Sequence, residues 1–289
     1  MSKAAQGFSL RRTDRTPQTE TRGERRSSEK GPYGWKLVKM PKISLSRGTI
    51  HYESYGGGQA LIGLHDGASS SMAWKDQIEV FSTYYRFITY DRLGYGRSEH
   101  HLLYEEGYFE QRANELGELV TDLNLHPVHL CGLCEGGAIA LAFASLFPEK
   151  VKTLIVQGVG YYGTDQTIAQ CEEYFQPWPE IDQGLRNRLV HHHGEGYAML
   201  KWEAIREARH YVWSLSYDLR PRFSSIEIPT LIMGGDRDPF FGLEHPIVAH
   251  RGIKNSELCI FPGAGHSPNE ETPQLFNEVV LGFLQRNTP

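Results

Sequence analysis

Cysteine is scarce in this sequence, and long apolar runs are absent from it. Four cysteines in 289 residues are too few for a disulfide scaffold, so we expect a reducing compartment and a cytoplasmic protein. No stretch approaches the roughly 18 to 20 apolar residues that a membrane-spanning helix needs. The net charge of −5 gives no reason to expect nucleic-acid binding. We therefore expect neither a membrane nor a nucleic acid as partner.

Residues 1–33 lack the apolar side chains that a folded segment would bury. They carry eight Lys or Arg and four Asp or Glu, against a net charge of −5 for the whole chain. Such a stretch buries too little apolar surface to offset the conformational entropy that it would lose on folding, so we expect a disordered polar tail. It has no apolar region of a secretory signal, and its acids argue against a transit peptide. Alternatively, this basic tail contacts a nucleic acid or a membrane, or translation begins at Met40 and the tail is not part of the protein.

From about residue 41 the pattern alternates between strands and helices. Short apolar runs interleaved with amphipathic helices are typical of a mostly parallel sheet covered on both faces. We therefore expect an α/β fold with an eight-stranded sheet flanked by helices. The expected strands are Lys42–Ser46, Thr49–Ser54, Ala60–Leu64, Arg86–Tyr90, Val128–Cys131, Lys152–Gln157, Thr230–Met233 and Glu257–Phe261, and the clearest helices are Glu110–Leu123, Gly136–Phe147 and Leu275–Leu284.

One stretch interrupts this alternation. About 70 residues between Gly158 and Thr230 have helical character, many aromatic residues and no obvious strand. A gap of that length inside a compact domain is better explained by an inserted subdomain than by a loop. The expected organisation is a core over residues 34–158 and 223–289, with a helical cap inserted at 159–222.

The sharpest local motif runs from Gly132 to Gly137. A strand passes directly into Gly-Leu-Cys-Glu-Gly-Gly and then into a helix. In a nucleophile elbow, the central residue occupies a strained strand-to-helix turn, and its neighbours must be small. The new helix then points its amino end at that residue, which stabilises a thiolate. The usual central residue is serine, and here it is Cys134.

Other interpretations of this cysteine stay open. Cys131 and Cys134 have the spacing of a redox pair, but Cys131 lies within an apolar strand and not at a helix start. The same pair lacks a second pair of ligands at metal-site spacing, so we expect no metal. Cys134 could also be a structural cysteine in a fold that has lost activity.

A cysteine nucleophile needs a base, and the base needs an acid that orients it. In the elbow topology these follow in the order nucleophile, acid, histidine. Asp238 and His266 each follow the end of an expected strand, where parallel sheets present catalytic groups. We expect a Cys134–His266–Asp238 triad, with Asp236 as the alternative acid.

The oxyanion hole should combine two backbone N–H groups. One belongs to Glu135, the residue after the nucleophile, and the other to the loop after Ala60–Leu64, where Gly67 is the favoured donor. We expect His65 in that loop to bond nearby backbone.

Several other residues are candidates for binding. Three adjacent histidines, His191 to His193, cannot converge on one ion if they are helical, because successive residues point about 100° apart; a cap-surface or pocket-edge role is expected. The Glu135 side chain could meet a cationic substrate group or be salt-bridged. The expected pocket residues are His65, Asp66, Glu135, Tyr161, Trp178, Trp202 and Trp213.

Taken together, the motifs resemble the α/β-hydrolase superfamily over residues 41–286. The resemblance rests on the segments 65–71, 90–98 and 132–137, on 235–238, and on Gly265-His266. It is strongest to capped single-domain esterases, C–C hydrolases and valacyclovir-hydrolase-like members. Asp66 stands where this family usually has glycine. Cys134 is similar to the nucleophile of dienelactone hydrolases, although the surrounding chain is more similar to the serine branch.

These observations predict hydrolysis of an ester, thioester or lactone through an acyl-enzyme intermediate. An acyltransferase, a cyclase or lyase on the same fold, and a ligand binder without catalysis are the alternatives. We expect a small-molecule acyl substrate, no cofactor, and a monomer or homodimer.

Overall fold

One twisted sheet forms the centre of the molecule. The computed structural model describes residues 37–39, 42–102, 104–125, 127–212, 214 and 216–287. Within these, nine strands form one sheet: eight follow the order β1-β3-β5-β4-β6-β7-β8-β9, and the ninth, β2, pairs with β3. The strands are β1 (Leu37–Lys39), β2 (Lys42–Leu45), β3 (Gly48–Tyr55), β4 (Ala60–Leu64), β5 (Arg86–Asp91), β6 (Val128–Leu133), β7 (Val151–Gln157), β8 (Thr230–Gly235) and β9 (Ser256–Phe261).

The sheet is mostly parallel, as the sequence predicts. Strands β5, β4, β6, β7, β8 and β9 run parallel to one another, whereas β1, β2 and β3 form an antiparallel edge in which β3 pairs with β5. The eight expected strands are all present, and β1 is additional. Because the parallel strands end at the same edge, the loops after β4, β6, β8 and β9 meet there.

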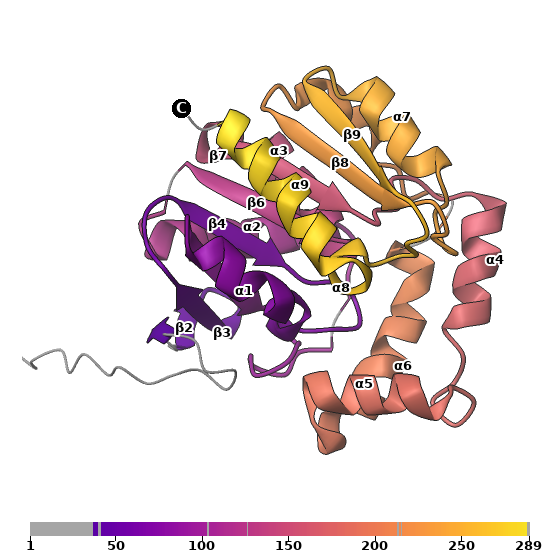
Figure 1. Cartoon of the computed structure of the whole chain (residues 1–289). Helices are drawn as coiled ribbons and strands as arrows, with labels where there is room; N and C mark the ends of the chain where they lie inside the picture. Colours follow the sequence, from indigo (N-terminus) through magenta and orange to yellow (C-terminus); the bar gives the residue numbers. More distant parts are fainter. Residues whose placement is uncertain are drawn as a thin grey trace, which may run out of the picture.

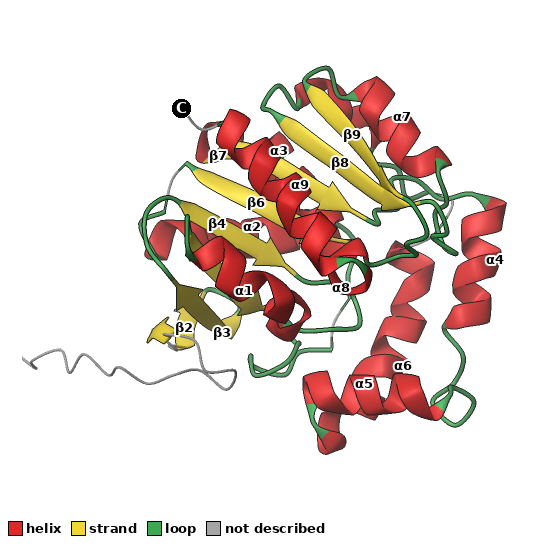
Figure 2. Ribbon diagram, in the orientation of Figure 1, coloured by secondary structure: helices red, strands yellow, loops and turns green. Residues whose placement is uncertain are grey.

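Helices cover both faces of the sheet (Figure 1, Figure 2). On one face α1 and α9 pack over a cluster that includes Trp74, Phe81 and Phe276. On the other face α2, α3 and α7 enclose a larger cluster. Their bounds are α1 (Lys75–Ser82), α2 (Tyr108–Asp122), α3 (Glu135–Leu146), α7 (Glu244–Gly252), α8 (Pro268–Glu271) and α9 (Pro273–Arg286), with short 3₁₀ turns at Ser71–Trp74, Pro148–Lys150 and Arg220–Ser225.

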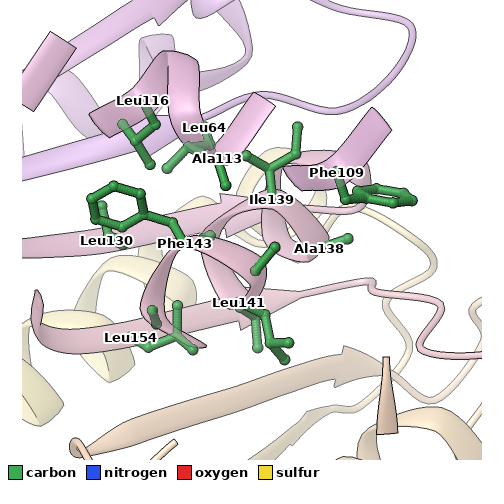
Figure 3. Packing of buried hydrophobic residues seen from close by; sticks show 14 of the residues in the cluster. Leu64, Phe109, Ala113, Leu116, Leu130, Ala138, Ile139, Leu141, Phe143 and Leu154 are labelled. Carbon is green, nitrogen blue, oxygen red and sulfur yellow. The ribbon is translucent and has the colours of Figure 1, made fainter. Parts of the chain in front are cut away.

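Helix α3 is apolar on every side, because it lies between the sheet and α2. Figure 3 shows its Ile139, Leu141 and Phe143 between Leu154 of the sheet and Leu116 of α2. A helix buried all round has little amphipathic pattern, so its position depends on packing and not on a single apolar face. This rigid support matters because α3 begins directly after Cys134.

Three helices lie between β7 and β8, to one side of the sheet (Figure 1). They are α4 (Asp165–Tyr174), α5 (Gln183–His193) and α6 (Glu195–Val212). They have a small core of their own, made by Ile181, Leu189, Ala198 and Trp202. We refer to α4–α6 as the cap. The expected tail, residues 1–33, lies outside the described residues.

Candidate active site

Cys134 lies at the turn between β6 and α3 in a backbone conformation that side chains rarely adopt. Its φ is 51° and its ψ is −117°. The turn is tight: a Cβ on Gly136 would lie 2.4 Å from the carbonyl oxygens of Leu64 and His65, and one on Gly132 would lie 2.5 Å from Gly137 Cα. Only glycine fits at both positions. Strain of this kind persists where the surrounding structure enforces it, and it commonly marks a functional residue.

His266 and Asp238 lie together at the ends of β9 and β8. His266 Nδ1 is 3.0 Å from Asp238 Oδ2. The backbone N–H groups of Phe240 and Phe241 donate to Asp238 Oδ1 at 2.8 and 3.3 Å. Burial alone would raise the pKa of Asp238, but the hydrogen bond from His266 and these two N–H groups lower it. Asp238 is therefore ionised at neutral pH and orients the imidazole.

The alternative acid, Asp236, has a different partner. Its Oδ1 accepts a hydrogen bond of 2.6 Å from the backbone N–H of Gly263. Asp236 therefore stabilises the turn after β9, whereas Asp238 contacts His266.

His266 also contacts Cys134. Burial would lower the pKa of His266, but the charge of Cys134 and hydrogen bonds to Asp238 and Cys134 raise it well above its usual range. With Nδ1 on Asp238, Nε2 is the ring nitrogen left for the sulfur. Gly158 makes room for the loop, since a Cβ there would lie 2.5 Å from the carbonyl oxygen of His266.

The loop after β4 carries the expected oxyanion donor; we call residues 65–71 the oxyanion loop. The Asp66 carbonyl accepts hydrogen bonds from Arg92 Nη2 at 2.9 Å and from His65 Nδ1 at 2.7 Å. Because a trans peptide unit is planar, fixing this carbonyl directs the Gly67 N–H to the opposite side. The backbone N–H of Arg92 donates to His65 Nε2, so His65 is a structural residue with a backbone role.

Glu135 contributes to a buried network and not to the pocket floor. Its Oε1 accepts from Arg92 Nη2 at 2.7 Å, from Tyr108 at 2.7 Å and from Tyr95 at 3.1 Å. The same guanidinium donates to the carbonyls of His65 and Asp66. Arg92 thus joins the two segments that carry the expected oxyanion donors, Gly67 and Glu135. Of the two roles expected for the Glu135 side chain, the structure therefore shows the salt bridge, with Arg92 as the partner.

A cavity of about 410 Å³ opens beside Cys134 and His266, between the cap and the ends of the strands. Aromatic side chains form much of its wall, and carboxylates with a single Arg lie at its polar end. Among the described residues its lining consists of Asp66, Gly67, Ala68, Cys134, Cys171, Tyr174, Phe175, Arg188, Pro239, Phe240, Phe241, His266, Ser267, Glu270 and Glu271.

The polar end of the cavity has an excess of negative charge. Arg188 makes two hydrogen bonds with Glu270, at 3.0 and 3.2 Å, and lies 4.0 Å from Asp66. Asp66 accepts from the Ala68 N–H and the Ser69 hydroxyl, and Glu271 accepts from two backbone N–H groups. Burial raises the pKa of Glu270, although Arg188 opposes that effect. Arg188 is the single Lys or Arg side chain in the described lining.

Most of the expected pocket residues lie elsewhere. Of the set, Asp66 lines the cavity. His65, Tyr161 and Trp202 are buried in packing, and Trp202 donates from Nε1 to the Gln176 carbonyl within the cap. Trp178 packs against the same cap core, and Trp213 lies outside the described residues. Trp178 and Trp202 thus belong to the cap core, and Tyr161 to the core cluster at the sheet.

The residues that line the cavity had weak signals in the sequence. Phe240 and Phe241 follow Asp238 and Pro239, and their rings contact His266 with centroid distances of 4.9 and 5.6 Å. Cys171 and Tyr174 are three residues apart in α4 and share a helix face. Burial, and then the charge of Cys134, raise the pKa of the Cys171 thiol to about 12, so this second thiol stays protonated.

No metal-binding group of three His, Cys, Asp or Glu side chains occurs in the part of the chain that the structure describes. The four cysteines are unpaired, and Cys131 is fully buried in β6, where burial raises the pKa of its thiol. In the same described part, no helix has the length and apolar character to cross a membrane.

Comparison with known proteins agrees with this architecture. A sequence model described as "Alpha/beta hydrolase family" matches residues 61–279. A 2-hydroxy-6-oxo-6-phenylhexa-2,4-dienoate hydrolase of Comamonas testosteroni is 27% identical over 277 residues, which cover 87% of this chain and 96% of that protein. The human protein named serine hydrolase BPHL, from Homo sapiens, is 25% identical, with 86% of this chain and 87% of that protein covered.

Solved structures share the fold. A crystal structure of a membrane phospholipase A, described as a bacterial virulence factor, superimposes with a TM-score of 0.75 at 19% identity. The match covers 87% of this chain and 86% of that one.

Proposed function

Because the chain belongs to the alpha/beta hydrolase family, we propose that it hydrolyses an ester, thioester or lactone through a Cys134–His266–Asp238 triad. The observation that carries the proposal is the position of Cys134. Its strained φ of 51° places it at the elbow, and it contacts a histidine whose other nitrogen is 3.0 Å from Asp238. This geometry supports the assignment of Cys134 as nucleophile, His266 as base and Asp238 as orienting acid.

The proposed reaction has two steps. Cys134 Sγ attacks the carbonyl carbon, and the backbone N–H groups of Gly67 and Glu135 stabilise the oxyanion. The bond to the leaving group then breaks as His266 donates its Nε2 proton to that group. Next, His266 takes a proton from water, the hydroxide adds to the acyl thioester, and Cys134 leaves as the thiolate. The products are a carboxylic acid and an alcohol or thiol.

The environment of His266 favours the protonated form of its ring. The raised pKa of His266, caused by Cys134 and Asp238 against the effect of burial, keeps the proton on the ring at neutral pH. A thiolate is already ionised, so it attacks without a proton transfer in the transition state. Substrates with good leaving groups should therefore be hydrolysed fastest, and amides slowest.

The cavity favours an acyl group that is largely apolar. Tyr174, Phe175, Phe240 and Phe241 offer an aromatic surface, and a volume of about 410 Å³ suits a small molecule. At the polar end the carboxylates outnumber the one Arg, which Glu270 already pairs. A neutral or cationic substrate therefore fits better than an anionic one.

Hydrolysis of a carbon–carbon bond is the second candidate, because the relative from Comamonas testosteroni is named for it. Its dienoate substrate is a carboxylate, and such a substrate would have to displace Glu270 from Arg188. The charge at the polar end of the cavity thus favours the ester or thioester.

The test is turnover of a matched panel by the wild type and two variants. The panel comprises an aryl ester, an acyl thioester, the corresponding amide and a 2-hydroxy-6-oxodienoate. We expect turnover of the ester and thioester, and a loss of at least about 10³-fold in Cys134→Ala, as for removal of other catalytic nucleophiles.

Cys259→Ala is the matched control, because Cys259 is half-buried in β9 and outside the cavity lining. It should keep the wild-type rate. If only the dienoate is turned over, the proposed substrate class is wrong. If Cys134→Ala keeps full activity, Cys134 is not the nucleophile.

A further inference from the structure

The three adjacent histidines at the end of α5 have three different environments. His191 is exposed, whereas His192 Nδ1 lies 2.8 Å from the Ser70 hydroxyl. His193 is buried and uses both ring nitrogens. Since Ser70 belongs to the oxyanion loop, two of the three histidines join the cap to loops at the active site.

His193 links two loops of the core. The backbone N–H of Gly96 donates to its Nδ1 at 3.2 Å, so Nδ1 is the unprotonated nitrogen. Nε2 therefore carries the proton and donates to the Ala68 carbonyl at 3.2 Å. Burial, and then the charges of Lys201 and His192, lower the pKa of His193 to about 3, although the Ala68 bond and Asp66 oppose this. The ring is neutral at pH 7.

Ala68 directly follows the expected oxyanion donor. On the amino-terminal side of Gly67, the carbonyl of Asp66 is held from the core by Arg92 and His65. On the carboxyl-terminal side, the carbonyl of Ala68 is held by His193, which belongs to the cap. The peptide unit before Gly67 is therefore held by the core, the unit after it by the Asp66 carboxylate through the Ala68 N–H, and the next unit, which carries the Ala68 carbonyl, by the cap.

The other end of this link is also anchored. Gly96 has a φ of +50°, and a Cβ there would lie 2.5 Å from the Asp91 carboxylate, so its backbone has little freedom. Asp91 itself accepts from the Ser71 N–H at 2.7 Å. Helix α6 adds a contact nearby, since the Tyr197 hydroxyl donates to the Gly94 carbonyl at 3.1 Å. The cap is thus docked on the two loops that hold the oxyanion donor.

We propose that His193 is a positioning residue through which the docked cap fixes the oxyanion loop, so that acylation of Cys134 depends on the hydrogen bonds of His193. This inference rests on the proposed function. His193 touches no substrate and does not line the cavity. It acts through the position of the oxyanion loop, which it holds at Ala68, next to Gly67.

The test compares three single variants. His193→Phe keeps an aromatic ring and removes both hydrogen bonds, His193→Gln keeps one acceptor and one donor, and His191→Phe makes the same change at the exposed neighbour. Two rates are measured. Acylation by a chromogenic thioester needs the oxyanion hole, whereas alkylation of Cys134 by iodoacetamide forms no oxyanion.

We expect His193→Phe to lower the acylation rate by about 10- to 100-fold, somewhat less than the loss of a whole oxyanion donor. Its alkylation rate and the KM for the thioester should stay within about threefold of the wild type, because the nucleophile and the cavity are unchanged. His193→Gln should recover most of the acylation rate, and His191→Phe should match the wild type. If His193→Phe does not fold, His193→Ala takes its place with the same expectations.

An unchanged acylation rate in His193→Phe would overturn the inference. So would an equal fall in acylation and alkylation, which indicates general disruption, or a His193→Gln variant as slow as His193→Phe. A wild type that alkylates but forms no acyl-enzyme would reject the proposed function itself, and is recognised before any variant is compared.

Discussion

At the scale of single residues, two carboxylates two positions apart have different tasks. Asp238 is buried against His266, and Asp236 closes the turn after β9 through the Gly263 N–H. Sequence order alone leaves both as candidate acids, because the same turn supplies both. The structure separates them by the direction of each side chain.

Asp238→Asn should therefore lower kcat by about 10³- to 10⁴-fold, because an amide no longer fixes the productive tautomer of His266. Asp236→Asn, the matched control, should cost less than about tenfold, because an amide oxygen can still accept from Gly263. Steady-state kinetics on one activated ester measures both. The opposite order of effects would assign the role of triad acid to Asp236.

At the scale of elements, one side chain from the loop after β5 supports the amino end of α3. Arg92 is fully buried, and it pairs with Glu135, the first residue of α3, as well as with two carbonyls of the oxyanion loop. Removal of one partner from a buried pair leaves an uncompensated charge. The stability of this region thus depends on the pair as a unit.

Arg92→Met should lower the free energy of unfolding by about 3–5 kcal/mol, and Arg92→Met combined with Glu135→Gln should recover a large part of it. Arg47→Met is the control, because Arg47 pairs with Glu105 at the surface, where such pairs contribute about 0–1 kcal/mol. Urea unfolding measures all three. A single Arg92→Met variant as stable as the wild type would show that the Glu135 network needs no cation.

The elements themselves were largely predictable from the sequence. Short apolar runs that end at glycine or at a charged residue located β4 and β5 to within one residue, because a buried parallel strand is apolar on both faces. Helices α1 and α7 were not predicted, since neither has a long apolar face. The trio of Cys134, Asp238 and His266 was predictable because parallel strands bring their carboxyl ends to one edge.

The pocket was not predictable in the same way. Aromatic residues such as Trp202 in α6 and Phe175 after α4 look alike in a sequence, but one fills the cap core and the other lines the cavity. Which of them faces the cavity depends on how α4–α6 pack together. That packing is set by tertiary contacts and not by the period of a single helix.

At the scale of the whole molecule, buried histidines couple folding to pH. Burial lowers the pKa of His129 and of His245 to about 4 and that of His193 to about 3, with further contributions from neighbouring charges. In the unfolded chain a histidine has a pKa near 6.5. Below pH 6.5 the unfolded state therefore takes up protons that the folded state does not, and acid favours unfolding.

The free energy of unfolding should fall as the pH drops from about 6.5 to about 4, by up to about 1.4 kcal/mol per pH unit for each of these histidines. His266 has a raised pKa, so its effect lies above pH 6.5 and has the opposite sign. Urea unfolding at pH 7, 6 and 5 measures the slope. His129→Gln should reduce it and His191→Gln should not; a pH-independent stability over this range would contradict the account.

The role of Cys134 as nucleophile is tested by the mass of the enzyme quenched in acid during turnover of an acyl thioester, followed by peptide mapping. We expect one added acyl group, located on the peptide that contains Cys134, released by hydroxylamine and absent from Cys134→Ala. An acyl group on any other residue, or steady turnover by Cys134→Ala, would contradict that role.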